Sequence, residues 1–222
     1  MNKLTSNWNS SISEGQYRRK DSQFRHQITR DGVSGFKAEK NRYHFYVSLA
    51  CPWAHRTLVF RALKGLEEYI SVSVVHPDMH TKGWSFAHDN DSAKLYATTG
   101  DDLYGANYLS EHYFSNDPHY KGNITVPVLW DKQQKLIVNN ESSEIIRMLN
   151  SAFDHLTGNT QDYSPQHLRK QIDEINEFVY DNINNGVYKT GFATSQSAYE
   201  ENAIRLFSAL DKIDQRLSTQ RY

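Results

Sequence analysis

The sequence predicts an α/β domain followed by an all-helical domain. Two patterns support this prediction. Between Tyr43 and Val75 a strand-like run, a helical run and a second strand-like run follow one another, which is the order of a βαβ unit. After Asn150 the apolar residues recur with the period of a helix, and no strand pattern follows. The length of 222 residues allows one large domain or two small ones.

The βαβ unit is the first strong signal along the chain. Residues 43–49 combine aromatic and β-branched side chains, as in a strand that is packed on both faces. From Ala54 the apolar residues fall on one side of a helix that ends near Gly65. Residues 70–75 alternate like a second strand. This order predicts two parallel strands with a right-handed crossover.

The middle of the chain predicts a hairpin after a long connection. Residues 78–122 are polar and rich in aromatic side chains, and only residues 107–114 have a helical pattern. Connections of this length in a compact domain are commonly functional. The apolar runs 124–130 and 136–138 flank a polar four-residue turn, which predicts an antiparallel hairpin.

Three helices follow the hairpin. Asn139 and Asn140 cap the first, which starts near Glu141. The second starts at the pair Ser164-Pro165 and ends at residues 184–186. Ser197, with Glu200 three residues later, forms a capping box for the third.

Composition divides the chain into three parts. Residues 1–40 are rich in Ser, Asn, Gln, Arg and Gly and show no apolar period, which predicts an irregular arm wrapped on the domain. Residues 41–150 form the α/β domain. Residues 164–222 form the helical domain, after a linking segment that contains Gly, Asn and Thr.

Charge and cysteine content exclude several classes of function. A net charge of -1 argues against binding to nucleic acid or to an anionic membrane. The polar N-terminus and the lack of a run of roughly 20 apolar residues predict a cytoplasmic protein. Its single cysteine excludes an internal disulfide and argues against structural zinc. His76 and His80 flank Pro77 in a predicted solvated loop, so we expect no metal.

Cys51 lies where a predicted strand meets the start of a predicted helix. Free backbone N–H groups and the positive end of the helix dipole stabilise a thiolate there, so we expect a pKa below the free-thiol value of about 8.5. Pro52 in the first turn removes no hydrogen bond, and His55 and Arg56 add positive charge. The alternative is a small buried apolar residue at a strand end.

Two further features supply groups for a peptide-like ligand. Pro127 interrupts an apolar run, which predicts either an edge strand or a cis bond that turns the backbone groups of Val126 away from the sheet. At the next helix start, Glu141 offers a carboxylate to an ammonium group. Ser142 offers a hydroxyl and an N–H to a carboxylate. The alternative role for this pair is helix capping.

Five motifs together resemble the glutathionyl-hydroquinone reductases, which are the Xi class of the glutathione transferase superfamily. The resemblance extends from about residue 43 onward and weakly into the arm. The motifs are residues 50–56 (ACPWAHR), 83–86 (GWSF), 125–131 (TVPVLWD), 139–143 (NNESS) and 184–193 (NNGVYKTGFA).

The resemblance implies a thioredoxin-like domain that holds glutathione, followed by a helical glutathione-transferase domain. It implies that Cys51 is the nucleophile and that Tyr188, with Tyr180 as a second candidate, faces the quinol. The alternatives, independent of the family, are that Trp84 is a core aromatic and that Tyr180 packs within the helical domain. The glutathione-binding residues implied by the resemblance are Trp84, Val126, Pro127, Glu141 and Ser142.

The implied activity is the reduction of glutathionyl-hydroquinones to hydroquinones through a mixed disulfide between the enzyme cysteine and glutathione. Glutathione is the co-substrate and is released as its disulfide. The resemblance also implies a homodimer. Two alternatives stay open: an omega-like or glutaredoxin-like thiol transferase or dehydroascorbate reductase, and a non-catalytic glutathione-binding module.

The chain departs from the family pattern at two places. Asn123 stands where family members often have a basic residue, so a charge contact to glutathione is absent or comes from Lys121. The family's helical domain continues with several further helices, whereas this sequence stops at Tyr222. We therefore expect a partial helical domain.

Overall fold

The computed structural model describes residues 11–79, 82–86 and 94–221, which divide into two compact units. Unit 1 comprises the described residues between 22 and 163. Unit 2 comprises residues 11–21 and 164–221. The arm predicted over residues 1–40 therefore contributes to both units.

Unit 1 is built on a four-stranded mixed sheet. Its strands are β5 (Tyr43–Val47), β6 (Ser71–Val74), β7 (Val128–Asp131) and β8 (Leu136–Asn139), in the order β6-β5-β7-β8. Strand β5 runs parallel to β6 and antiparallel to β7, which in turn is antiparallel to β8. Every residue of β5 is buried. The predicted βαβ unit and hairpin are both confirmed.

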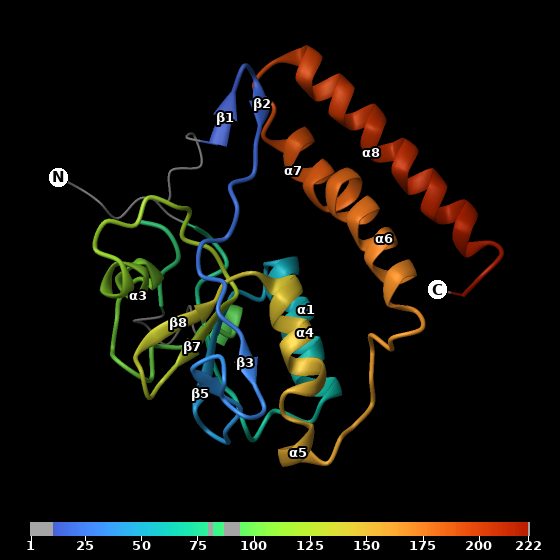
Figure 1. Ribbon diagram of the computed structural model, residues 1–222. Helices are drawn as coiled ribbons and strands as arrows, with labels where there is room; N and C mark the ends of the chain where they lie inside the picture. The colour runs from blue at the N-terminus through green and yellow to red at the C-terminus, as the bar shows by residue number, and fades with distance from the viewer. Residues whose placement is uncertain (1–10, 80–81, 87–93, 222) are drawn as a thin grey trace. The chain divides into compact units, whose positions relative to one another are not determined.

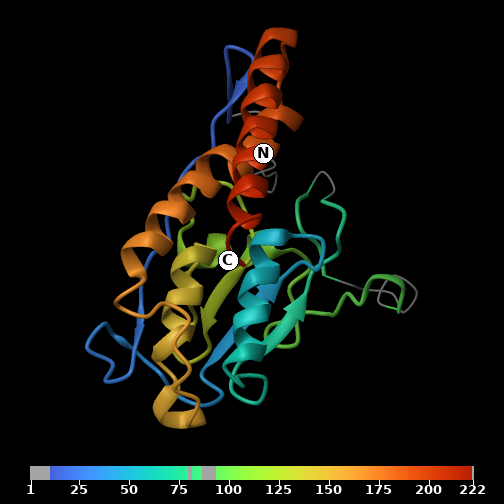
Figure 2. The same ribbon diagram turned by 90° about the vertical axis from the view of Figure 1, so that its right-hand side faces the viewer.

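Helices cover both faces of this sheet. Helices α1 (Pro52–Leu63) and α4 (Ser142–Ser151) lie side by side on one face, and α3 (Leu109–Asn116) lies on the other (Figures 1 and 2). Helix α1 ends before Gly65, whose φ of 65° is the left-handed conformation that favours glycine. This arrangement is the one that the resemblance implies for the first domain.

The core of unit 1 lies between these layers. Its largest fully buried side chains are aromatic and come mainly from the two central strands, and each contributes on the order of 1.5–3 kcal/mol by leaving water. They include Tyr43, Phe45, Tyr46, Tyr113 and Trp130. The start of α1 therefore follows a buried central strand after the short connection formed by residues 48–51.

The arm is more ordered than we predicted. Over residues 11–40, which the structure describes, it contains four two-residue strands, and side chains from residues 28–38 enter the core of unit 1. Such short strands carry no readable period, which is why composition alone indicated an irregular segment. The strands are β1 (Ile12–Ser13) and β2 (Gln16–Tyr17) in unit 2, and β3 (Ile28–Thr29) and β4 (Phe36–Lys37) in unit 1.

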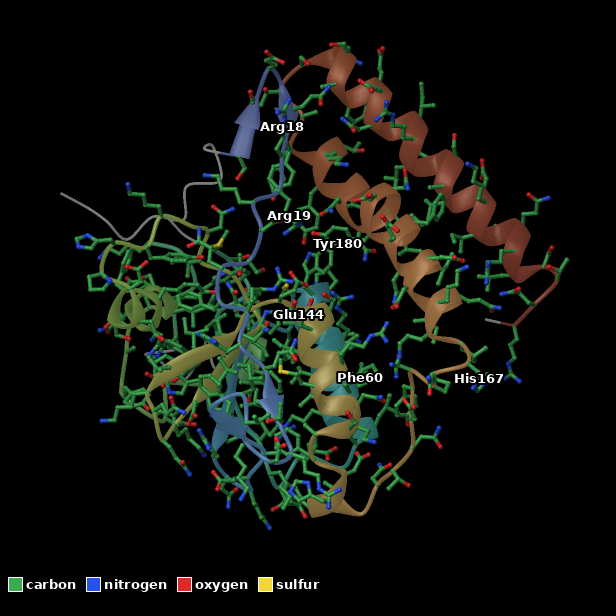
Figure 3. All side chains as sticks on the ribbon, in the orientation of Figure 1. Arg18, Arg19, Phe60, Glu144, His167 and Tyr180 are labelled. Carbon is green, nitrogen blue, oxygen red and sulfur yellow. The ribbon has the colours of Figure 1, made fainter. Side chains whose placement is uncertain are left out.

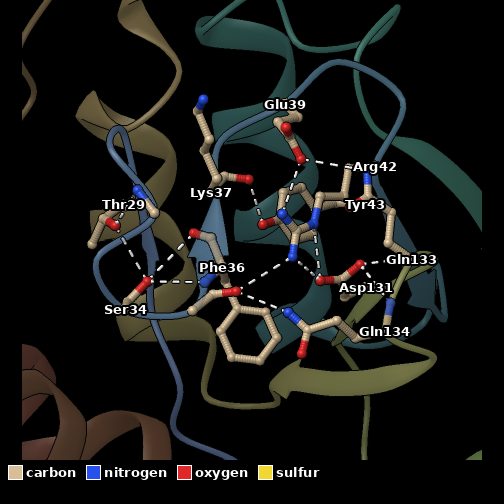
Figure 4. A network of polar contacts seen from close by, with 12 residues as sticks. Thr29, Ser34, Phe36, Lys37, Glu39, Arg42, Tyr43, Asp131, Gln133 and Gln134 are labelled. Atoms are coloured by element: carbon tan, nitrogen blue, oxygen red, sulfur yellow. Dashed lines mark hydrogen bonds and ion pairs between the residues drawn. The ribbon is translucent and has the colours of Figure 1, made fainter.

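A buried ion pair fixes part of the arm to the sheet (Figure 4). Arg42 donates from Nε and Nη2 to one carboxylate oxygen of Asp131, at 2.9 and 2.6 Å. Its Nη1 bonds Glu39 at 2.9 Å. The carbonyl of Gly35 accepts from Arg42 and from Gln134. These contacts join the segment before β5 to the end of β7.

Unit 2 is helical, as predicted. Its helices are α6 (Arg169–Val179), the π-helix η2 (Tyr180–Asn184), α7 (Asn185–Gly191) and α8 (Gln196–Leu217). Within the described residues, no strand follows residue 150. Over the same residues, no helix is both long enough and apolar enough to cross a membrane. The short helix α5 (Asp154–Thr157) precedes the boundary, in unit 1.

Three predicted helix limits in unit 2 are wrong. The chain does not leave the helix at residues 184–186, because η2 continues directly into α7. Gly186 instead allows close packing, since a β-carbon there would lie 3.3 Å from a methyl group of Leu206. Helix α6 begins at Arg169, after a turn, rather than at residues 164–165. Ser195, not Ser197, caps α8.

Candidate active site

Cys51 is the N-cap residue of α1, as its place in the sequence predicts. Its backbone is extended, with φ of -97° and ψ of 115°, and its carbonyl accepts the first helical hydrogen bond from the N–H of His55 at 2.9 Å. Its own N–H donates to the carbonyl of Ser48 at 3.1 Å. The half-buried sulfur therefore lies at the end of the helix where the dipole is positive.

The bond between Val126 and Pro127 is cis. The edge-strand alternative is wrong, because β7 begins at Val128 and pairs with a strand on each side. The carbonyl oxygen of Val126 lies 3.6 Å from the sulfur of Cys51, where the thiol can donate to it. The structure thus brings together the thiol and the backbone group that we expected to meet a peptide.

Glu141 is the N-cap residue of α4, and its carboxylate accepts from the backbone N–H of Ser143 at 3.1 Å. The same oxygen accepts from the Ser143 hydroxyl, and the other accepts from the hydroxyl of Ser22 at 3.1 Å. The predicted caps Asn139 and Asn140 are wrong. The side-chain oxygen of Asn139 accepts from the N–H of Glu141. The side chain of Asn140 accepts from the N–H of Phe24 and donates to the hydroxyl of Tyr113.

Arg56 connects the starts of α1 and α4, a contact that the sequence did not indicate. Its Nε and Nη2 donate to the hydroxyl oxygen of Ser142 at 3.0 and 2.8 Å. Nη2 also lies 3.7 Å from a carboxylate oxygen of Glu141. The guanidinium stacks over the ring of Trp53, at 5.2 Å from its centroid. A carboxylate, a hydroxyl and a cation therefore gather at one helix start.

Trp84 is half-buried and packs against the core of unit 1. Its carbonyl accepts from the N–H of Leu109 at 3.0 Å, which fixes its backbone at the start of α3. The indole N–H is buried and has no hydrogen-bond partner within the described part of the chain. A buried tryptophan N–H usually has a hydrogen-bond partner, so this donor departs from the usual pattern.

Tyr180 and Tyr188 belong to unit 2. Tyr180 is the first residue of η2 (Figure 3), and Tyr188 lies on α7. The Arg19 guanidinium lies 4.4 Å from the ring centroid of Tyr188, and its Nε donates to Asn185 at 2.6 Å. Tyr17 stacks on Tyr188 at 6.2 Å.

These contacts place the arm against the candidate quinol residue within unit 2. Burial raises the pKa of Tyr17, and the nearby Arg19 charge opposes that rise. The neighbouring groups of Tyr188 and Tyr180 raise the pKa of Tyr17 further. Contacts between the arm and Tyr188 could not be predicted, because the arm shows no apolar period.

A charge pair also holds the first turn of α4. Arg25 donates through two nitrogens to the carboxylate of Glu144, which is labelled in Figure 3. This pairing, helped by a hydrogen bond from the Asn139 amide, holds the pKa of Glu144 below its ordinary value against the opposing effect of burial. A negative charge in a first helical turn is also favoured by the dipole.

The described residues contain no cluster of three or more His, Cys, Asp or Glu side chains suited to a metal ion. His80 lies outside the described residues. The site in unit 1 instead offers a thiol, a backbone carbonyl beside it, and a helix start that bears a carboxylate, a hydroxyl and a cation. These groups suit a small peptide-like thiol with a free amino-acid end.

Comparison with known proteins agrees with this chemistry. Residues 50–152 match the family model described as glutathione S-transferase, N-terminal domain. Glutathionyl-hydroquinone reductase YqjG of Escherichia coli is 53% identical over 214 residues, which cover 94% of this chain and 64% of that protein. Glutathione S-transferase omega-like 2 of Schizosaccharomyces pombe is 50% identical, over 93% of this chain and 65% of that protein.

Solved structures agree in both fold and sequence. The crystal structure of glutathione-S-transferase Xi from Phanerochaete chrysosporium matches with a TM-score of 0.90 and 47% identity, over 99% of this chain and 70% of that one. The glutathione-bound structure of the E. coli YqjG protein matches with a TM-score of 0.85, over 90% of this chain and 65% of that one. The chain thus spans a little under two thirds of the length of the E. coli and S. pombe relatives.

Proposed function

Because the chain belongs to the Xi class of the glutathione transferase family, we propose that it reduces glutathionyl-hydroquinones to hydroquinones through a mixed disulfide on Cys51. The observation that carries the proposal is the position of the Cys51 sulfur, at the N-cap of α1 and 3.6 Å from the carbonyl of Val126. A cysteine in this place supports covalent thiol exchange rather than simple activation of glutathione.

The first step transfers the glutathionyl group to the protein. The Cys51 thiolate attacks the sulfur of the glutathionyl-hydroquinone, and the bond between that sulfur and the aromatic carbon breaks. The carbon keeps the electron pair and takes up one proton, so the hydroquinone leaves reduced. The protein retains glutathione as a disulfide on Cys51. The hydroxyl of Tyr188 is our candidate proton donor, with Tyr180 second.

The second step restores the thiol. The thiolate of a second glutathione attacks the glutathione sulfur of the mixed disulfide, and oxidised glutathione leaves. One protein cysteine is therefore enough, because the resolving thiol comes from the co-substrate. Per turnover, one glutathionyl-hydroquinone and one glutathione give one hydroquinone and one glutathione disulfide.

The glutathione moiety would occupy the site in unit 1. The backbone of Val126, before Pro127, would pair with the cysteinyl residue of glutathione, and Trp84 would lie against the tripeptide. Glu141 would hold the α-ammonium group of the γ-glutamyl residue. Ser142 would bind the neighbouring carboxylate.

We also propose a cytoplasmic homodimer. The family resemblance supports the dimer. The free thiol of the single cysteine supports a reducing compartment. Light scattering coupled to size-exclusion chromatography tests the dimer through its mass, which would be twice the 25.8 kDa of one chain.

The test of function is steady-state turnover of a glutathionyl-hydroquinone with glutathione, followed by chromatography of the quinol. We expect stoichiometric hydroquinone and glutathione disulfide, and no turnover by Cys51→Ser. Turnover of dehydroascorbate or mixed disulfides without turnover of the quinol substrate would favour the omega-like alternative. Glutathione binding with no turnover of any of them would favour a binding module.

A further inference from the structure

Arg56 lies beside the candidate glutathione site but is not among the residues proposed to bind glutathione directly. It lies five residues after Cys51 on α1, and its side chain reaches the first residue of α4. Two of its nitrogens donate to the hydroxyl oxygen of Ser142 at 3.0 and 2.8 Å. The Ser142 side chain is 3% exposed, so its hydrogen bonds are made in a dry environment.

The direction of these two bonds determines what Ser142 offers to a ligand. A serine hydroxyl has two lone pairs and one hydrogen. Arg56 fills the lone pairs, and it supplies both hydrogen bonds that the described residues give to this oxygen. The hydroxyl hydrogen therefore stays available to an acceptor outside the protein. A carboxylate is the acceptor that gains most from it, because the hydrogen bond is then charge-assisted.

The charge of Arg56 favours the same ligand. Its side chain is 31% exposed, and Nη2 lies 3.7 Å from a carboxylate oxygen of Glu141, so the cation and the carboxylate lie side by side at one helix start. Glu141 already accepts three hydrogen bonds, from Ser22 and from two groups of Ser143. A carboxylate has about four acceptor positions, so one is left for an ammonium group. An α-amino acid end carries both matching charges.

We propose that Arg56 is a positioning residue that fixes the Ser142 hydroxyl as a donor to the α-carboxylate of the γ-glutamyl group. This inference rests on the proposed function and deepens it, because it names a residue through which the site recognises one end of glutathione. Arg61 shows the contrasting structural role on the same helix. Its guanidinium donates only to the backbone carbonyls of Ile70 and Glu67 among the described residues.

The experiment compares two disulfides that react with Cys51. Oxidised glutathione carries the γ-glutamyl group, whereas 2-hydroxyethyl disulfide has neither a carboxylate nor an ammonium group. We measure the second-order rate of Cys51 modification by each, from the mass of the intact protein. The variants are Arg56→Met and Arg56→Lys. Arg61→Met is the matched control on the same helix.

We expect Arg56→Met to slow the reaction with oxidised glutathione about 10- to 100-fold, the effect of losing a charge-assisted hydrogen bond. The reaction with 2-hydroxyethyl disulfide should change less than about twofold, and Arg56→Lys should recover part of the loss. Arg61→Met should alter neither rate. Adding Ser142→Ala to Arg56→Met should produce little further loss, because one residue acts through the other.

Equal slowing with both disulfides, or no slowing with oxidised glutathione, would overturn the inference. If Arg56→Met does not fold, as judged by circular dichroism, the same comparison is made with Arg56→Lys and Arg56→Gln. The assay contains no quinol, so its outcome is independent of hydroquinone release. A chain that fails to reduce quinol conjugates can still show the selective slowing by Arg56→Met. A chain that reduces them can also lack this slowing.

Discussion

The sulfur of Cys51 lies 3.6 Å from the carbonyl oxygen of Val126, although 75 residues separate them in the chain. The sheet explains this contact. Strand β5 pairs antiparallel with β7, and Tyr46 is paired with Val128. The carboxyl end of β5 and the amino end of β7 therefore lie next to each other at the same end of the sheet. Cys51 follows the first and Val126 precedes the second. The register of two central strands therefore sets the position of the thiol.

If Glu141 binds an ammonium group, Glu141→Gln weakens the affinity for glutathione about 10-fold or more, because a charged hydrogen bond becomes neutral. Titration calorimetry in a Cys51→Ser background measures this. Wild-type protein should also discriminate against N-acetylglutathione, and Glu141→Gln should lose that discrimination.

Glu111→Gln is the matched control, since Glu111 accepts from two backbone N–H groups at the start of α3. A similar loss of affinity in this variant would show that any carboxylate at a helix start has the same effect. The Glu141 assignment would then be wrong.

The ion pair between Arg25 and Glu144 makes the stability of unit 1 depend on pH. Because the pKa of Glu144 is lowered in the folded state, its stabilising contribution is present above the unfolded value of about 4.3 and is lost as pH falls through the folded value. Glu144→Gln should lower the free energy of unfolding by about 0.5–1 kcal/mol at pH 7, as for a part-exposed pair.

Urea denaturation at several pH values from 7 to 3 measures this difference, which should shrink as the pH falls. Glu174→Gln is the control, because its pair with Lys170 is exposed and 3.9 Å long. A wild-type advantage over Glu144→Gln that stays constant down to pH 3 contradicts the account.

Arg19 attaches the arm to α7 through Tyr188 and Asn185. Arg19→Ala removes a cation–π contact and a hydrogen bond, so the free energy of local opening around residues 16–19 should fall by about 1–2 kcal/mol. Amide hydrogen exchange followed by mass spectrometry reports this opening. The exposed neighbour Arg18, changed to alanine, should leave the exchange unchanged. Equally faster amide exchange in both variants would show that Arg19 makes no specific stabilising contact with α7.

Arg42 and Asp131 form a buried pair, with side chains 7% and 0% exposed. Arg42→Met leaves the Asp131 carboxylate without its cation, which typically costs about 3–5 kcal/mol. The urea midpoint should fall accordingly. Asp31→Asn, at an exposed position of the arm, should change it by less than about 0.5 kcal/mol. A midpoint unchanged by Arg42→Met would mean that the pair contributes nothing to stability.

The parts of the fold with a clear period could be predicted from the sequence. The βαβ unit and the hairpin follow from apolar runs that are bounded by turn residues. Pro127 interrupts one of these runs, which left an edge strand and a cis bond as alternatives, and the structure has the cis bond. The continuation of η2 into α7 could not be predicted, because the Asn-Asn-Gly sequence at residues 184–186 is typical of a helix stop. Gly186 serves a different purpose, since it lets α7 approach Leu206.

The candidate site was only partly predictable for a related reason. Cys51, Pro127 and Glu141 each carry a local signal, because a helix start or an interrupted strand is visible in a few residues. The contact between Arg56 and Ser142 joins positions 86 residues apart, so it depends on the packing of α1 against α4. The contact between Arg19 and Tyr188 likewise joins distant parts of the chain, so it depends on how the arm packs against α7.

Intact-protein mass spectrometry of a single turnover tests the central claim most directly. Wild-type protein is mixed with one equivalent of a glutathionyl-hydroquinone in the absence of free glutathione. We predict that the protein gains the mass of one glutathionyl group on Cys51 while one equivalent of hydroquinone is released, and that added glutathione then removes the group. Release of hydroquinone from an unmodified protein, or equal release by Cys51→Ser, would contradict the mechanism.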